Sequence, residues 1–197
     1  MLKNIIIYGA GGFGREVAWL IERINKVRQE WNILGFVDDG KTGMFGKNIN
    51  GIKLLGGKEW FASNKEEIYV TCPVGRSKVR RSMQQCLEQY PNVKSAALVD
   101  PSVVIGDTSA VGNGAIICYG ARITVNAKIG KGVVINTGSS IGHDSDLGDY
   151  CKDRGIFDPI KDDITYGMRN MSPLTCFTQK EKEAQYNLCT LAIVAVK

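Results

Sequence analysis

Several features that direct a protein to a metal, a membrane or nucleic acid are missing from this 197-residue chain. One histidine and six cysteines without a C-x-x-C pair cannot form a zinc site at the usual spacings, so we expect reduced, mostly buried thiols and no metal. No apolar run reaches about 18 residues, and the N-terminus has no basic segment followed by a long apolar stretch, which predicts a cytoplasmic protein without a membrane segment. The net charge of +5 forms no basic stripe beside aromatic residues, which excludes nucleic acid and favours small anionic ligands.

A hydrophobic repeat of period six runs through the second half of the chain. An aliphatic residue, here called a leader, stands at every sixth position: Val99, Ile105, Val111, Ile117, Ile123, Ile129, Ile135, Ile141 and Leu147. Two positions before each leader from Ile105 onward is a small or β-branched residue, which shares the leader's face of a strand. This period is typical of a parallel β-helix. Each hexad is predicted to form one short strand and one corner, with the glycine that follows five leaders easing the turn.

The N-terminal part has the pattern of a strand, a glycine turn and a helix. The apolar run 4–8 leads into glycines and then an amphipathic stretch; the glycines are Gly9, Gly11, Gly12 and Gly14. Glycines here let backbone N–H groups approach a diphosphate at the positive end of a helix. The same glycines also suit close packing of a helix on a strand without any ligand.

Two further apolar runs extend this unit. The run 33–37 ends in Asp38 and Asp39, where a doubly wound sheet places a carboxylate on a ribose, although acidic residues also end strands in ordinary turns. The run 68–72 leads to a second helix, on which Arg76 and Arg80 either bind phosphate or are solvated. The order β-α-β-β-α-β predicts a small parallel sheet that ends near residue 99.

The two patterns together predict an α/β plus all-β protein, with a small Rossmann-like parallel α/β domain at residues 1–97 and a parallel β-helix at 98–151. The glycine turn followed by hexads that contain Gly142, His143, Asp144 and Ser145 resembles the bacterial sugar acyltransferases. This family includes sialic acid O-acetyltransferases and UDP-4-amino-sugar N-acetyltransferases. The resemblance implies a left-handed β-helix of hexapeptide repeats, a homotrimer, acetyl-CoA as co-substrate between subunits, and a nucleotide-activated amino sugar or a sialic-type sugar as acceptor.

The resemblance also implies roles for individual residues. His143 is the general base with Asp144 beside it, Gly142 lies at acetyl-CoA, and Asn136 with Thr137 frames the acceptor. The sugar nucleotide lies near the glycine turn, with Asp38 and Asp39 toward the uridine; the remaining contacts are Gly9, Gly11, Gly12, Gly14 and Gly75, the last closing the pocket. The register of the hexads independently puts His143 on a corner, where we expect it to face solvent or a neighbouring subunit.

The repeat stops after Leu147, because the next leader positions hold Asp153 and Pro159. Family members usually carry a second histidine where this chain has Lys152. The atypical tail 152–197 is a cap on the coil, a segment from a shifted reading frame or a new segment with its own partner. Two other functions therefore stay open, namely a catalytically impaired nucleotide-sugar-binding relic and an NAD-binding protein with a structural coil.

Overall fold

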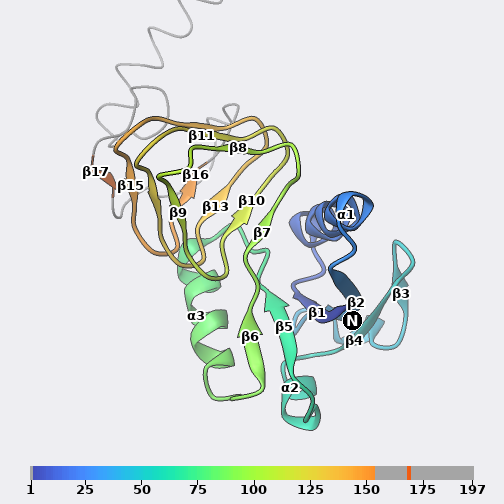
Figure 1. The fold of residues 1–197 in the computed structure, drawn as a ribbon. Helices are drawn as coiled ribbons and strands as arrows, with labels where there is room; N and C mark the ends of the chain where they lie inside the picture. Colours follow the sequence, from blue (N-terminus) through green and yellow to red (C-terminus); the bar gives the residue numbers. More distant parts are fainter. Residues whose placement is uncertain (1, 154–167, 170–197) are drawn as a thin grey trace, which may run out of the picture.

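A sheet flanked by helices lies beside a three-sided coil in the computed structural model, which describes residues 2–153 and 168–169 (Figure 1). The sheet has the order β3-β4-β2-β1-β5-β6 and is parallel except for β3. Its unit contains β1 (Lys3–Tyr8), α1 (Gly12–Val27), β2 (Trp31–Val37), η1 (Thr42–Met44), β3 (Asn48–Ile49), β4 (Ile52–Gly56), α2 (Glu59–Ser63), β5 (Ile68–Thr71), α3 (Ser77–Leu87) and β6 (Val93–Ser95).

The β3–β4 hairpin and the helix α2 are absent from the expected order β-α-β-β-α-β, and the sheet ends at Ser95 instead of near residue 99. Asn50 and Gly51 connect the hairpin with φ values of +49° and +82°. Asn-Gly is the dipeptide preferred in tight hairpins with positive φ, so it is the sequence signal for this element.

The α/β unit buries apolar residues on both faces of its sheet. Val17 and Ile21 lie on one face of α1 and pack against Ile5 of β1. The alternate residue Ile6 of β1 points to the opposite face, where it joins a cluster with Phe61 of α2. The apolar spacing of the sequence therefore accounts for the layers of this unit.

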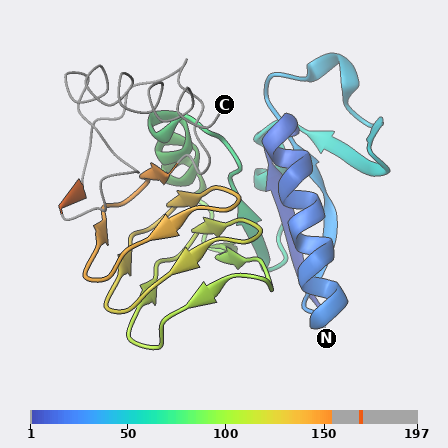
Figure 2. The ribbon, with the colours of Figure 1, turned by 90° about the horizontal axis from the view of Figure 1, so that it is seen from above.

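Every leader ends a two-residue strand of the coil, which confirms one strand and one corner for each hexad. The strands are β7 (Leu98–Val99), β8 (Val104–Ile105), β9 (Ala110–Val111), β10 (Ile116–Ile117), β11 (Arg122–Ile123), β12 (Lys128–Ile129), β13 (Val134–Ile135), β14 (Ser140–Ile141) and β15 (Asp146–Leu147). The strands from β7 to β13 each pair in parallel with the strand 18 residues further on. This pairing gives the three sheets of the coil and the stacked layers seen from above (Figure 2).

The stacking continues one strand beyond the apolar repeat. In β16 (Lys152–Asp153), Asp153 takes the register of a leader and is opposite Ile135. The two-residue strand β17 (Met168–Arg169) then pairs antiparallel with β15. Apart from these residues, the predicted tail and the three explanations for it lie outside the described residues.

Glycines of the coil have a different role from the one that the sequence suggests. A Cβ added to Gly112, which follows a leader, would lie 2.6 Å from the carbonyl carbon of Gly130 in the next coil. These glycines therefore allow close stacking of the coils. The turn itself is made three positions after the leader, where φ is positive at Gly114, Gly120, Asn126, Gly132, Gly138, Asp144 and Tyr150.

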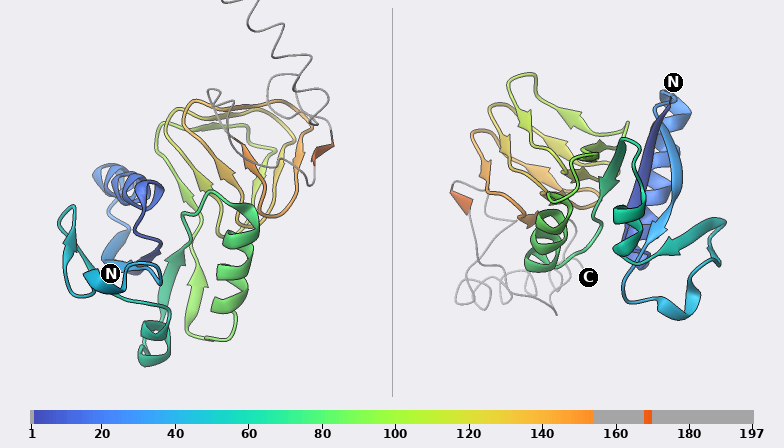
Figure 3. Two further views of the ribbon diagram at one scale, coloured as in Figure 1. Left: turned by 180° about the vertical axis from the view of Figure 1, so that it is seen from behind. Right: turned by 90° about the horizontal axis from the view of Figure 1, so that it is seen from below.

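One side of the coil packs against the α/β unit. The residues that precede the leaders point outward, and on this side they are the fully buried Leu98, Ile116 and Val134, which join the core cluster of α1 and β1. On a second side, Val104 at the equivalent position is 65% exposed. The coil thus covers part of the sheet face that also bears α1, while α3 lies next to another part of the coil (Figure 3).

Candidate functional site

The four glycines between β1 and α1 have two different structural roles. Gly9 has a φ of +127°, and a Cβ added to Gly14 would lie 1.9 Å from the Gly9 carbonyl oxygen, so the backbone requires both. Gly11 and Gly12 are exposed. A Cβ on Gly11 would meet no atom within 4 Å, and one on Gly12 would meet only the Arg15 guanidinium at 3.9 Å. Packing therefore explains Gly9 and Gly14, whereas Gly11 and Gly12 leave free space at the start of α1.

Asp38 is already bound to the glycine turn. Its carboxylate accepts hydrogen bonds from the backbone N–H of Ala10 at 2.8 Å and of Gly40 at 2.9 Å. These contacts fix the end of β2 to the loop after β1. Asp38 thus shapes the turn, and the neighbouring Asp39 is the more open of the two carboxylates.

A pocket of about 380 Å³ opens at the carboxyl end of the sheet, where open α/β sheets bind ligands. Asp39 lines it and accepts hydrogen bonds from the Tyr8 hydroxyl at 2.6 Å and from the Lys58 backbone N–H at 2.7 Å. Burial and the nearby Asp39 carboxylate raise the pKa of Tyr8, which keeps its hydroxyl a donor. The complete lining is Tyr8, Asp39, Lys58, Lys78, Val79, Ser82, Met83 and Cys86.

Asp39 alone among the predicted residues lines this pocket. Sequence reasoning missed Tyr8 and the face of α3, although Val79, Met83 and Cys86 recur at helical spacing and so indicate one shared face. Gly75 lies elsewhere, since a Cβ on it would be 3.1 Å from Lys152 Nζ. It therefore marks the contact between the α/β unit and the coil.

Of the two arginines for which solvation or phosphate binding was expected, Arg76 is exposed but Arg80 is fully buried. Both expectations are therefore wrong for Arg80, whose guanidinium binds backbone carbonyl groups.

Four cysteines lie in the described part of the chain. Cys72, Cys118 and Cys151 are buried thiols, Cys86 is half-buried, and none of the four forms a disulfide. In the described ranges, no three potential metal ligands cluster and no helix is long and apolar enough to cross a membrane.

His143 lies on the corner between β14 and β15, and its side chain is 78% exposed, as the register predicts. Its Nδ1 is 2.7 Å from Asp144 Oδ2, and Asn126 donates to Asp144 Oδ1 at 3.0 Å. The left-handed φ of +57° at Asp144 lets these consecutive side chains meet. Hydrogen bonds from His143 and Asn126 hold the pKa of Asp144 below its usual value. Among the described residues, Asp144 is the hydrogen-bond partner of the His143 ring, through Nδ1.

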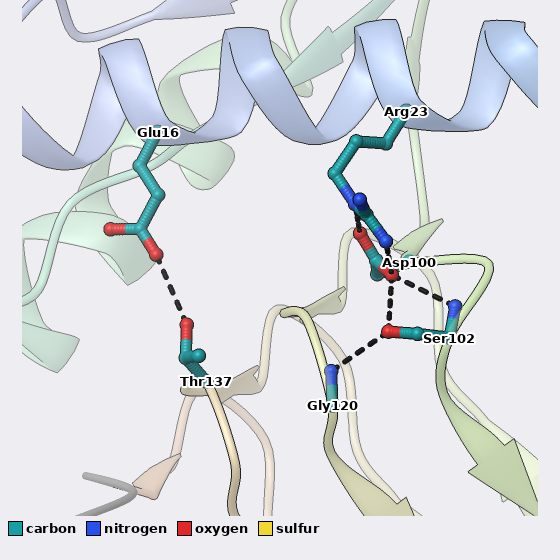
Figure 4. Close-up of polar contacts among 6 residues, drawn as sticks. All are labelled: Glu16, Arg23, Asp100, Ser102, Gly120 and Thr137. Carbon is teal, nitrogen blue, oxygen red and sulfur yellow. Dashed lines mark hydrogen bonds and ion pairs between the residues drawn. The ribbon is translucent and has the colours of Figure 1, made fainter.

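Asn136, Thr137 and Gly142 occupy different places around this corner. Thr137 lies on the preceding corner of the coil and donates a hydrogen bond to Glu16 of α1 at 3.3 Å (Figure 4). Asn136 is half-buried beside it, and Gly142 directly precedes His143. Within one chain, the structure therefore places Thr137 near the start of α1 but puts His143 on another corner.

The comparisons with known proteins agree with both units. The family model of the PglD N-terminal domain matches residues 4–87. GDP-perosamine N-acetyltransferase from Escherichia coli O157:H7 is 29% identical over 147 residues, which cover 73% of this chain and 64% of that protein. The chain thus spans less than two thirds of this curated relative.

Solved structures share the whole arrangement. WeeI from Acinetobacter baumannii AYE matches with 30% identity and a TM-score of 0.66, over 76% of this chain and 68% of that one. The acetyltransferase domain of PglB from Neisseria gonorrhoeae FA1090 in complex with acetyl coenzyme A matches with 21% identity and a TM-score of 0.66, over 77% and 70%. An α/β domain joined to a coil of hexads defines a protein of the hexapeptide-repeat class. The chain belongs to the bacterial sugar acyltransferase family.

Proposed function

We propose that this chain transfers an acetyl group from acetyl-CoA to a nucleotide-activated amino sugar or a sialic-type sugar, with His143 as the general base. The observation that carries the proposal is the 2.7 Å contact between His143 and Asp144 on an exposed corner. Acetyl-CoA is bound by the PglB domain of the same fold, and the curated relative is an N-acetyltransferase of a nucleotide-linked sugar.

The geometry of the corner suits proton abstraction. Nδ1–H of His143 donates to the Asp144 carboxylate, so the lone pair of Nε2 is available as the base. When the acceptor amine or hydroxyl attacks the thioester carbonyl, Nε2 takes its proton as the new bond to carbon forms. The C–S bond then breaks, and the proton passes to the departing sulfur. Backbone N–H groups of a corner are suitable donors to the transient oxyanion.

The complete site requires more than one copy of the chain. The sugar nucleotide occupies the open start of α1 at Gly11 and Gly12 and the pocket at Asp39, whereas the base is on a corner that contacts only coil residues within the described part of the chain. In a homotrimer, the acceptor held by one copy meets the histidine of a neighbour. Gly142 then borders acetyl-CoA in the groove between subunits, and the coil is left-handed.

Replacing His143 with alanine tests the mechanism. We expect kcat to fall by about a hundredfold to ten-thousandfold, because the base is lost while both binding sites stay intact. The measurement is acetyl-CoA consumption with GDP- and UDP-amino sugars and with free sialic acid, and the control is Lys128→Ala on an exposed strand position of the coil. An unchanged rate in His143→Ala would falsify the role of the histidine.

The end of the apolar repeat at Leu147 favours one second candidate, a nucleotide-sugar-binding relic of such an enzyme. This protein would bind the sugar nucleotide without transferring acetyl groups. Two results together identify this case: sugar nucleotides raise the melting temperature, and no acetyl group is transferred. A ligand at a hundred times its Kd stabilises the folded protein by about 2.7 kcal/mol, which such a melting experiment detects. A rise in melting temperature with NAD but not with sugar nucleotides identifies an NAD-binding protein instead.

A further inference from the structure

Arg80 of α3 is the largest side chain that the described part of the molecule buries completely. No described carboxylate forms an ion pair with it, although an isolated charge is costly to bury. Burial lowers the pKa of Arg80 to about 10, which leaves the guanidinium charged at neutral pH. Something other than a carboxylate must therefore stabilise it.

Backbone carbonyl groups stabilise the guanidinium instead. A guanidinium has five N–H donors in a planar fork, and five carbonyl oxygens lie within hydrogen-bond distance of its nitrogens. They belong to Gly132 at 2.6 Å, Val74 at 2.6 Å, Gly75 at 3.4 Å, Tyr150 at 2.5 Å and Cys151 at 3.1 Å. One side chain thus connects the loop after β5 with corners of two successive coils.

The loop that Arg80 holds also packs against the glycine turn. Val74 Cγ2 lies 3.5 Å from the Cβ position of Gly9, and Pro73 Cγ lies 3.7 Å from that of Gly14. Both glycines are those whose conformation the backbone requires. The loop 73–75 is therefore in contact with the turn on one side and fastened to the coil through Arg80 on the other.

We infer that Arg80 is a positioning residue for the nucleotide-sugar site, because it holds the loop 73–75 against the glycine turn by anchoring that loop to the coil. This inference rests on the proposed function. A lysine would have three donors and no planar fork, so it would leave at least two of the five carbonyl groups without their donor. The α/β unit is thus a nucleotide-sugar site only when it is fastened to the coil.

The test compares Arg80→Lys with the matched control Arg28→Lys, which makes the same exchange at an exposed arginine just after the C-terminal end of α1. In Arg80→Lys we expect KM and Kd for the sugar nucleotide to rise about tenfold, with kcat and KM for acetyl-CoA unchanged, because only the loop moves. The control keeps all four values. Equal changes for both substrates, or no change for either, overturn the inference.

Hydrogen exchange separates this inference from the proposed function. In the wild-type protein, a bound sugar nucleotide is expected to slow amide exchange both at 74–75 and at 150–151, because Arg80 links the two segments. Protection of the loop alone overturns this link. Without ligand, Arg80→Lys is expected to speed amide exchange at 74–75, and unchanged exchange there overturns the anchoring. A wild-type protein that binds no sugar nucleotide overturns the nucleotide-activated acceptor of the proposed function, whereas the exchange rates of Arg80→Lys without ligand still decide whether Arg80 anchors the loop.

Discussion

Three serines of the coil lie two positions before a leader, and two of them, Ser109 and Ser139, have opposite hydrogen-bonding surroundings. Ser109 Oγ donates to the Thr124 carbonyl at 2.6 Å and accepts from the Ala127 N–H at 2.9 Å, whereas Ser139 Oγ is buried without a partner among the described residues. We expect Ser139→Ala to stabilise the protein by about 1 kcal/mol and Ser109→Ala to destabilise it by about 1–2 kcal/mol. Urea unfolding measures both, and a loss of stability in Ser139→Ala would contradict the prediction.

The glycine turn offers a second pair of variants. Gly14→Ala is expected to destabilise the protein by about 3 kcal/mol or more, since its Cβ would overlap the Gly9 carbonyl oxygen. Gly11→Ala has open space, so we expect a melting temperature close to that of the wild type but weaker binding of the sugar nucleotide. Thermal melting and calorimetric titration measure the two effects. Undiminished binding in Gly11→Ala would speak against a ligand at the start of α1.

Single residues differ in how far the sequence predicts them. His143 could be placed on an exposed corner because every hexad repeats the same geometry and the register carries the information. Arg80 could not be placed, because its partners are backbone carbonyl groups that no residue type identifies. Tyr8 likewise needs the fold, since its partner Asp39 is 31 positions away.

At the scale of elements, a half-buried ion pair connects α1 to the residue that follows the first strand of the coil. Arg23 donates to Asp100 at 2.6 Å and 3.1 Å, and Ser102 donates to the same carboxylate while it accepts from the Gly120 N–H (Figure 4). Burial alone would raise the pKa of Asp100, but the hydrogen bonds from Arg23 and Ser102 outweigh it and hold that pKa low. This contact thus depends on pH.

A depressed pKa in the folded state gives stability that is present above the unfolded pKa of about 4 and is lost as pH falls through the folded pKa. We therefore expect the drop in unfolding free energy between neutral and strongly acid pH to be smaller in Asp100→Asn than in the wild type. Urea unfolding along a pH series measures the drop. The control Asp107→Asn changes an exposed aspartate of the coil, and an equal drop in all three proteins would refute the prediction.

The period of six predicts the strands of the coil, because a strand needs only alternating burial, but it does not show which side meets the α/β unit. That information is in a second period of 18 residues, which selects Leu98, Ile116 and Val134 just before their leaders. The hairpin and α2 are short elements without a periodic pattern. The turn residues Asn50 and Gly51 are a sequence signal for the hairpin but not for α2.

At the scale of the whole molecule, the two units share one hydrophobic cluster, while each also has a cluster of its own. Ile116→Lys would place an unpaired charge between them, and we expect a loss of about 3 kcal/mol or more. Val104→Lys makes the same change at the equivalent position of an exposed side and is expected to alter stability by less than about 0.5 kcal/mol. Chemical denaturation measures both, and similar values would show that the units do not share a core.

The anchoring of Arg80 also has a consequence for the order of folding. Its acceptors at Tyr150 and Cys151 are 70 and 71 positions further along the chain. Contacts of such long sequence separation form late, and chains fold from the N-terminus during synthesis. The α/β unit emerges first from the ribosome, yet the buried guanidinium has its full set of acceptors only after residue 151 has been made. Until then water solvates the guanidinium and the loop 73–75 has no anchor, so we expect the speed of translation through the hexads to set how long the loop stays unanchored.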